Sequence, residues 1–186
     1  MALTPSNMLP LGTVAPAFSL PDAVSGKTLT LDELKGEKAT VIMFICNHCP
    51  FVKHVNSALT KLANDYLNKS ISFIAISAND IAEYPEDAPD KMQQEALLHQ
   101  YPFPYLYDAS QDVAKAYMAA CTPDFYVFDQ NLKCIYRGQL DSSRPGNNIP
   151  VTGKDMRAAL DNHLAGLPIL ADQRPSQGCN IKWKKQ

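Results

Sequence analysis

The feature that most constrains this chain is an unbroken apolar run that leads directly into a pair of cysteines. Residues 39–45 are Ala-Thr-Val-Ile-Met-Phe-Ile, and the motif Cys-Asn-His-Cys follows at residues 46–49. A run so rich in β-branched residues is typical of a strand that is buried on both faces, as in a parallel sheet. Pro50 suits the first turn of a helix. We therefore expect a buried strand, a dithiol at its end, and a helix that begins near Cys49.

The patterns on either side predict further elements. Apolar residues at helical spacing continue to about residue 68, and the run 71–76 is typical of a second buried strand. Strand, helix and strand form a βαβ unit, whose crossover should be right-handed. Residues 78–90 are acidic and contain prolines, which predicts a surface loop. The other expected elements are strands at 16–20, 27–30, 105–107, 125–128 and 134–137, and helices at 31–34, 89–99, 111–118 and 153–164.

A βαβ unit followed by a β-hairpin and a terminal helix predicts an α/β, thioredoxin-like fold. We expect a central mixed β-sheet flanked by helices, with an N-terminal strand extension. The length of 186 residues fits a single domain over 1–186. Its core should span about 10–166, and residues 167–186 should form a C-terminal extension, an extended tail.

The position of the dithiol favours a reactive thiolate. Unpaired N–H groups at a helix N-terminus carry about half a positive charge, which stabilises an anion there. His48 adds a potential cation, and no acidic residue occurs between residues 42 and 64. We therefore expect Cys46 to be the more exposed and more acidic thiol, with a pKa below the ordinary value of about 8.5. The two-residue spacing should bring both sulfurs within disulfide reach.

A structural zinc site is an alternative interpretation of the two cysteines. Such a site usually has a second pair of Cys or His ligands, whereas Cys121, Cys134 and Cys179 occur singly. We therefore expect no metal and no organic cofactor. Two inert core cysteines are less favoured, because the strand-to-helix junction places them at an edge. An odd total of five cysteines is not typical of a secreted disulfide framework and favours a cytoplasmic location.

A proline before the expected hairpin could complete the site. In a thioredoxin fold, a proline at this point follows a cis peptide bond and lies opposite the dithiol, and Pro123 fits that position. Thr122 and Cys121 beside it are candidate substrate-binding residues, although Cys121 is equally typical of a small buried apolar residue. Cys134 lies inside an expected strand and should be buried.

With these residues, the chain resembles peroxiredoxin-like thioredoxin-fold proteins that carry a Cys-x-x-Cys, in the alkyl hydroperoxide reductase/thiol-specific antioxidant superfamily. The resemblance covers about residues 10–186 and rests on segments 15–20, 46–50, 121–125 and 178–183. Two departures matter. True peroxiredoxins have a Thr where this chain has Cys46, three residues before the peroxidatic position, Cys49. They also have an Arg where this chain has Pro123.

The resemblance implies a thiol–disulfide oxidoreductase. Cys46 would attack, Cys49 would resolve the mixed disulfide, His48 would stabilise the Cys46 thiolate, and Pro123 would help to dock the substrate chain. The substrate would be a disulfide-containing protein or a small thiol or disulfide. Two alternatives remain open: a weak thiol peroxidase that uses Cys49, and a redox sensor or soft-metal carrier without enzymatic activity.

Charge and hydropathy argue against other classes of partner. The net charge is -2, with 17 basic and 19 acidic residues, so no nucleic-acid partner is expected. The longest apolar stretch, residues 41–46, is much too short to span a bilayer, so no membrane partner is expected.

The tail contains one cysteine and the single tryptophan. Trp183 and Ile181 in a polar terminus predict that the tail docks on the domain, because burying Trp183 would offset the cost of ordering the segment. Cys179 could then lie near the dithiol as an extra resolving thiol, or far from it as a passive residue. The passive outcome is favoured, because a Cys-x-x-Cys already has its own resolving partner.

Overall fold

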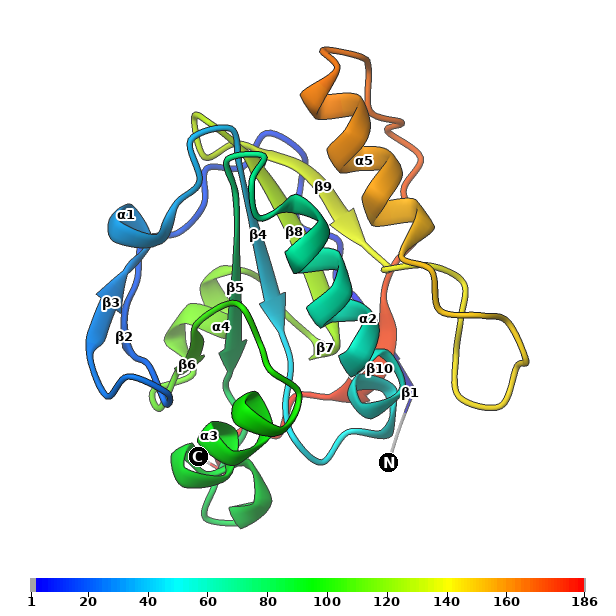
Figure 1. Cartoon of the computed structure of the whole chain (residues 1–186). Helices are drawn as coiled ribbons and strands as arrows, with labels where there is room; N and C mark the ends of the chain where they lie inside the picture. The colour runs from blue at the N-terminus through cyan, green and yellow to red at the C-terminus, as the bar shows by residue number, and fades with distance from the viewer. Residues whose placement is uncertain (1–2, 186) are drawn as a thin grey trace.

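The main sheet is built around the apolar run that the sequence singles out. The computed structural model describes residues 3–185, and its main sheet has five strands in the order β6-β5-β4-β8-β9 (Figure 1). β4, β5 and β6 are parallel, whereas β8 is antiparallel to both β4 and β9. The sheet is therefore mixed, as expected. Its strands are β4 (Ala39–Phe44), β5 (Ile71–Ser77), β6 (Tyr105–Tyr107), β8 (Asp124–Asp129) and β9 (Cys134–Gly138).

Helices cover both faces of this sheet. α2, α3 and α5 contribute to one apolar core, and α1 and α4 contribute to the other. The helices are α1 (Leu31–Leu34), α2 (Pro50–Tyr66), α3 (Pro89–Leu98), α4 (Asp112–Ala116) and α5 (Lys154–Leu164), with a short 3₁₀ helix η1 (Pro85–Asp87). Each helix expected from the sequence is present within a few residues of its predicted range.

The two cores explain why β4 is apolar without interruption. Alternate side chains of a strand point to opposite faces. Val41 and Met43 belong to the core beneath α2, where Leu59 is also buried. Ile42 and Phe44 belong to the core on the other face. A strand in this position therefore has no solvated face on which polar side chains would be tolerated.

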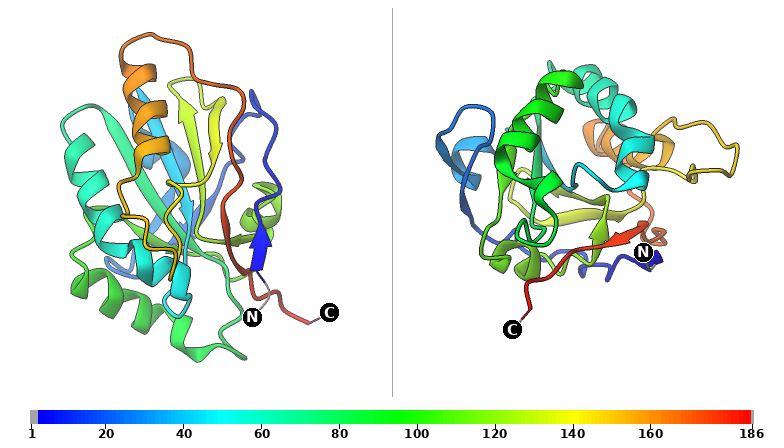
Figure 2. Two further views of the ribbon diagram at one scale, coloured as in Figure 1. Left: turned by 90° about the vertical axis from the view of Figure 1, so that its right-hand side faces the viewer. Right: turned by 90° about the horizontal axis from the view of Figure 1, so that it is seen from below.

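The chain termini form a second sheet that the sequence did not predict. No strand was expected before residue 16, and the tail was expected to be merely extended. Instead, β1 (Leu3–Pro5), β10 (Gln177–Asn180) and β7 (Cys121–Thr122) pair in the order β1-β10-β7. Figure 2 shows the red tail beside the blue N-terminal strand. A separate hairpin of β2 (Ser19–Pro21) and β3 (Thr28–Thr30) agrees with the prediction.

The tail docks, but not by burying its tryptophan. Trp183 remains 40% exposed, so that expectation is wrong, whereas Ile181 is 1% exposed. The backbone N–H of Lys182 donates to Asn79 Oδ1 at 2.8 Å. Gly178 packs so closely on β7 that a Cβ there would lie 1.9 Å from the carbonyl oxygen of Thr122. Backbone pairing and one aliphatic side chain therefore hold the tail. No helix among residues 3–185 has the length and apolar character needed to cross a bilayer.

This anchoring predicts which tail residue matters for stability. We expect Ile181→Ala to lower the free energy of unfolding by about 2–5 kcal/mol, as buried aliphatic truncations do. Trp183→Ala, the control at the partly exposed neighbour, should lower it by less. Urea unfolding of both variants checks the order. A larger loss for Trp183→Ala would mean that the indole anchors the tail.

Candidate active site

The dithiol lies where β4 meets α2, as the sequence predicted. Cys49 is the N-cap residue of α2, and Pro50 opens the helix. The two thiols are close enough that each shifts the pKa of the other. Thr122 spans both of them: its Oγ1 lies 3.5 Å from Cys46 Sγ, and its carbonyl oxygen accepts a hydrogen bond from the Cys49 thiol at 3.2 Å. The structure therefore brings the dithiol and the segment before Pro123 together.

Both thiols are buried, which corrects the expectation that Cys46 would be exposed. Cys46 is 1% and Cys49 0% exposed, and none of the cysteines among residues 3–185 is joined in a disulfide. Beside them, the Tyr84 ring stacks on the His48 imidazole at a centroid distance of 5.3 Å. Lys182 from the tail lies 5.6 Å from the centroid of the same Tyr84 ring.

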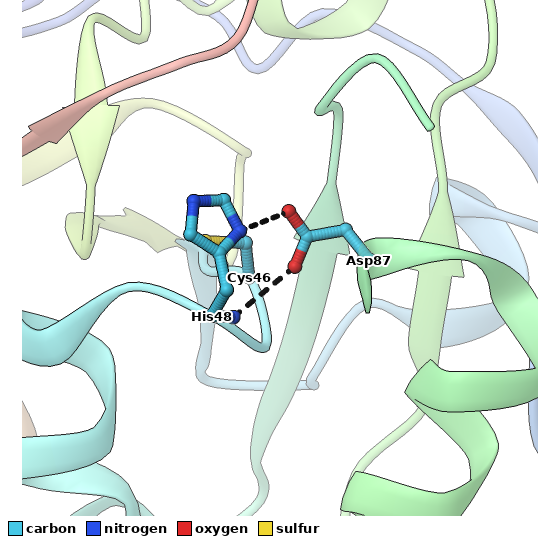
Figure 3. Close-up of side chains that lie close together, drawn as sticks. All are labelled: Cys46, His48 and Asp87. Atoms are coloured by element: carbon cyan, nitrogen blue, oxygen red, sulfur yellow. Dashed lines mark hydrogen bonds and ion pairs between the residues drawn. The ribbon is translucent and has the colours of Figure 1, made fainter. Parts of the chain in front are cut away.

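A buried carboxylate, Asp87, organises the loop that carries the dithiol. Asp87 is fully buried and accepts four hydrogen bonds. The donors are the backbone N–H groups of Asn47 at 2.8 Å and His48 at 3.2 Å, the His48 Nδ1 at 2.6 Å, and the Asn79 amide at 2.7 Å. In Figure 3 the imidazole of His48 faces this carboxylate, with Cys46 alongside. Asp87 therefore holds both His48 and the backbone between the cysteines.

Asp87 was not predicted as a site residue, because the acidic, proline-containing pattern of residues 78–90 predicts a surface loop. One signal could have found it. β4 and β5 are parallel neighbours, so the segments that follow them meet at the same edge of the sheet. The acids after β5 are therefore candidates to lie beside the dithiol after β4. Figure 1 shows both segments at the same end of the sheet.

The acidity of the two thiols is the reverse of the expectation. The pKa of Cys49 is lowered to about 4, chiefly by the hydrogen bond from the Cys46 thiol and, against the effect of burial, by further hydrogen bonds from Cys179 and Thr122. The pKa of Cys46 is raised well above its ordinary value by the same pairing with Cys49, by burial, and by the negative charge of Asp87. The surroundings therefore favour a thiolate at Cys49 over one at Cys46. The prediction was wrong because it considered only charged residues near the cysteines in the sequence, and Asp87 is distant in sequence.

The surroundings of His48 favour its protonated form, as expected. The partner responsible, Asp87, was not predicted from the sequence. Its pKa is raised from 6.5, chiefly by the hydrogen bond to Asp87. The Nδ1–Asp87 contact leaves Nε2 buried and without a hydrogen-bond partner among the described residues. A side chain so oriented can exchange a proton near Cys46.

The pairing of His48 with Asp87 predicts a measurable titration. We expect the NMR titration midpoint of His48 to lie above 6.5 and to fall in Asp87→Asn, since the neutral amide no longer favours the imidazolium. The matched control is Asp90→Asn, at an exposed carboxylate paired with Lys91. Because the folded pKa is raised, the pair stabilises the fold fully below pH 6.5, and this stabilisation is lost as the pH rises through the folded value. An unchanged midpoint in Asp87→Asn would contradict this assignment.

The expected second half of the site is present. The Thr122–Pro123 peptide bond is cis, as the resemblance implied. Cys121 is 0% and Thr122 3% exposed, so both side chains are as deeply buried as the two thiols of the dithiol. Burial raises the pKa of Cys121, whose thiol donates to the carbonyl of Pro123 at 3.7 Å. Cys121 is thus the small buried residue of the two alternatives. Cys134 is buried in the opposite core, as expected.

Cys179 is not remote from the dithiol, so the expectation of a distant position is wrong. β10 pairs with β7 in a register that places Cys179 opposite Thr122. Cys179 and Cys49 are close enough that each shifts the pKa of the other, and both belong to the same core. No local pattern in the sequence indicates this proximity, because residues 179 and 49 come together only through the pairing of the tail.

A metal ion is poorly suited to the group around Asp87. The candidate ligand atoms of Cys46, His48 and Asp87 all lie within 4.8 Å of one another. The Asp87 carboxylate is already saturated by its four hydrogen bonds, one of them from the His48 ring nitrogen that faces it. This arrangement favours proton exchange over ligation of a cation.

A small cavity of about 20 Å³ borders the other side of Pro123. Its walls include Phe51 in the first turn of α2, together with His54 and Arg144. His54 Nε2 lies 2.7 Å from Ser143 Oγ, so this histidine is engaged away from the thiols. The cavity marks a depression on the surface beside the dithiol.

Several solved structures are similar to this one. An uncharacterized conserved protein from Geobacillus kaustophilus is 59% identical, with a TM-score of 0.98 over 100% of this chain and 98% of that chain. A hypothetical protein from Sinorhizobium meliloti is 48% identical, with a TM-score of 0.96 over 98% of this chain and 100% of that chain. The thioredoxin domain of a thiol-disulfide oxidoreductase from Bacteroides vulgatus has a TM-score of 0.60 at 20% identity, over 70% of this chain and 89% of that chain. This last likeness confirms the thioredoxin-like fold.

The sequence itself assigns the family. No curated protein matches the chain. The model of the AhpC/TSA family matches residues 11–137, which include the dithiol, Asp87 and Pro123. The expected class of a thioredoxin-like redox protein is thereby confirmed, and the chain belongs to the AhpC/TSA family.

Proposed function

We propose that this protein is a thiol–disulfide oxidoreductase in which Cys49 attacks the substrate and Cys46 resolves the mixed disulfide. The observation that carries this order is the position of Cys49 at the N-terminus of α2, hydrogen-bonded by the Cys46 thiol. A thiolate is the nucleophile in disulfide exchange, and a helix N-terminus favours it. Asp87 opposes a thiolate at Cys46 in the reduced protein.

The reaction would proceed in two exchanges. In the first, the Cys49 thiolate forms a bond with one sulfur of the substrate disulfide, and the other sulfur leaves as a thiolate. In the second, Cys46 gives up its proton and attacks Cys49 Sγ, and the second substrate sulfur leaves. One substrate disulfide is reduced, and the Cys46–Cys49 dithiol is oxidised to a disulfide. A small thiol or a protein dithiol then returns it to the reduced form.

His48 and Asp87 would serve the second exchange. The ligand-forming atoms of Cys46, His48 and Asp87 lie within 4.8 Å of one another, so His48 can accept the Cys46 proton through one water or after a small movement. Asp87 then stabilises the imidazolium, as the raised pKa of His48 indicates. In this role His48 assists deprotonation of the resolving thiol.

The substrate would approach beside Pro123. The cavity there holds about 20 Å³, so it suits a side chain or the edge of an extended chain, not an enclosed small molecule. Because both sulfurs are buried, the residues that cover them must move aside during the reaction. We propose a disulfide-containing protein or small disulfide as the substrate and the cytoplasm as the location, since five cysteines do not form an even secretory framework.

Peroxide reduction at Cys49 is the second candidate, favoured by membership of the AhpC/TSA family and by the lowered pKa of Cys49. Two features oppose it. A second thiol, Cys46, occupies the place of the peroxidatic-site Thr, and Pro123 occupies the place of the Arg. The groups that polarise a peroxide in true peroxiredoxins are therefore replaced.

A pair of assays separates the two candidates. We expect the protein to accelerate reduction of insulin disulfides by dithiothreitol, and we expect hydrogen peroxide to oxidise the reduced protein slowly. Insulin turbidity and stopped-flow oxidation are the measurements, with a dedicated peroxiredoxin as the reference. Oxidation at the rate of that reference, without insulin reduction, would establish the peroxidase instead.

A further inference from the structure

The strand β10 carries a third cysteine into the redox centre. Cys179 lies opposite Thr122 in the β10–β7 register, and the Thr122 carbonyl oxygen lies 3.2 Å from Cys49 Sγ. The approach is close, because a Cβ at the preceding Gly178 would lie 1.9 Å from that carbonyl oxygen. Cys46, Cys49 and Cys179 are buried in the same core. A glycine before the cysteine is thus what permits the tail to reach this position.

Cys49 is the central member of the three thiols. Its pKa responds to both Cys46 and Cys179, so both thiols lie close to it. In disulfide exchange a thiolate attacks one sulfur of a disulfide while the other sulfur leaves, so the attacked sulfur lies between its two partners. The arrangement suits exchange through Cys49 better than shared binding of a metal ion.

From this juxtaposition we propose that Cys179 is a second resolving thiol, which forms a disulfide with Cys49. This role rests on the proposed function and adds a residue to it. Starting from the Cys46–Cys49 disulfide, the Cys179 thiolate attacks Cys49 Sγ. The Cys49–Cys179 bond forms, the Cys46–Cys49 bond breaks, and Cys46 leaves as a thiolate that takes up the proton lost by Cys179. No external oxidant is needed, because the exchange leaves the number of disulfides unchanged.

Cys179 can reach Cys49 in a second circumstance. When Cys49 holds a substrate sulfur in a mixed disulfide, attack by Cys179 releases that sulfur as a thiolate and again leaves a Cys49–Cys179 bond. Attack is then intramolecular and prearranged, because Ile181 and the Lys182–Asn79 hydrogen bond already hold the strand in place. The tail presents its cysteine to Cys49 as a docked substrate strand would.

The charge on Cys49 would control when Cys179 reacts. In the reduced protein the pKa of Cys179 is raised to about 12 by burial and by its hydrogen bond and charge interaction with Cys49, while Lys182 acts in the opposite direction. Once Cys49 is part of a disulfide, its negative charge is gone. Cys179 is therefore unreactive in the reduced protein and becomes a better nucleophile after Cys49 is oxidised.

The test uses glutathione disulfide on variants of the full chain. In Cys46→Ser, we expect glutathione to be added to Cys49 and then released, leaving a Cys49–Cys179 cross-link that peptide mass mapping detects after acid quenching and alkylation. In Cys46→Ser/Cys179→Ser, glutathione should remain on Cys49. Cys46→Ser/Cys134→Ser is the matched control, because Cys134 is equally buried but lies in the opposite core, and it should behave as Cys46→Ser does.

Retention of glutathione on Cys49 in Cys46→Ser, with Cys179 alkylated, would overturn the proposal, and so would a Cys49–Cys121 cross-link. If Cys46→Ser fails to fold, the oxidised wild type decides by the same mapping. A fraction with Cys49 linked to Cys179 supports the proposal, and Cys46–Cys49 as the sole disulfide overturns it. Insulin reduction by the wild type is measured in parallel. Insulin reduction without the cross-link refutes the role of Cys179 alone, whereas the cross-link without insulin reduction refutes the proposed function alone.

Discussion

Cys49→Ser is expected to abolish disulfide reduction, lowering the initial rate of insulin reduction by roughly a hundredfold or more, as losses of a nucleophile do. Cys49 forms the thiolate, and both of its thiol neighbours act only through it. Serine preserves the size of the side chain but does not ionise at neutral pH. Loss of activity should therefore occur with little loss of stability.

The matched control for this variant is Cys134→Ser. Cys134 is 2% exposed in the opposite core, so its replacement makes a comparable buried change far from the dithiol. It should keep nearly the full rate. A Cys49→Ser protein that accumulates a mixed disulfide with substrate on Cys46 would instead identify Cys46 as the attacking thiol.

Asp87→Ala is expected to destabilise the fold by about 3–5 kcal/mol, the range for removing one partner of a buried charged pair. Its carboxylate is fully buried and accepts four hydrogen bonds, two of them from the backbone between the cysteines. Alanine leaves all four donors without an acceptor, and unpaired buried donors are costly. Denaturant unfolding measures the loss. Asp90→Ala, at a carboxylate whose side chain is 68% exposed, is the control and should be nearly neutral.

The same carboxylate gives the fold a specific sensitivity to acid. Burial alone would raise the pKa of Asp87, but hydrogen bonds from His48 and Asn79 outweigh it and lower the pKa below 3.8. A lowered native pKa means that the stabilisation is present above the unfolded value and is lost as the pH falls through the native one. Acid unfolding of the wild type should therefore steepen below about pH 4, and Asp87→Asn should reduce this slope.

The fold could be predicted from the sequence wherever local pattern determines structure. The continuous apolar run 39–45 indicated a strand between two cores, and Pro50 indicated the start of the following helix. A short helix was predicted at residues 31–34, and Thr30 caps it through a reciprocal capping box with Glu33. Each of these patterns involves residues that are close together in the chain, so it can be recognised in a single sequence.

The parts that could not be predicted depend on contacts between distant segments. Asp87 controls the acidity of Cys46, yet it lies 41 positions along the chain in a different loop. Cys179 reaches Cys49 only because β10 pairs with β1 and β7, and residues 177–180 carry no strand-like alternation. The pKa values of the thiols and the contacts between them follow from the tertiary structure. The spacing of residues along the sequence does not reveal either.

The place of β10 between β1 and β7 has a consequence for biosynthesis. β4, the dithiol and α2 leave the ribosome long before the tail does. At about 5–20 residues per second, Cys179 is translated roughly ten seconds after Cys49. During that interval the nascent chain contains Cys46 and Cys49 but not yet Cys179. The edge of β7 that β10 will later pair with is still unpaired. Until β10 is translated, thiols of other molecules can react with Cys49, and strands of other proteins can pair with the β7 edge. Slowing translation near codon 170 should therefore increase the amount of mixed disulfide on newly made chains.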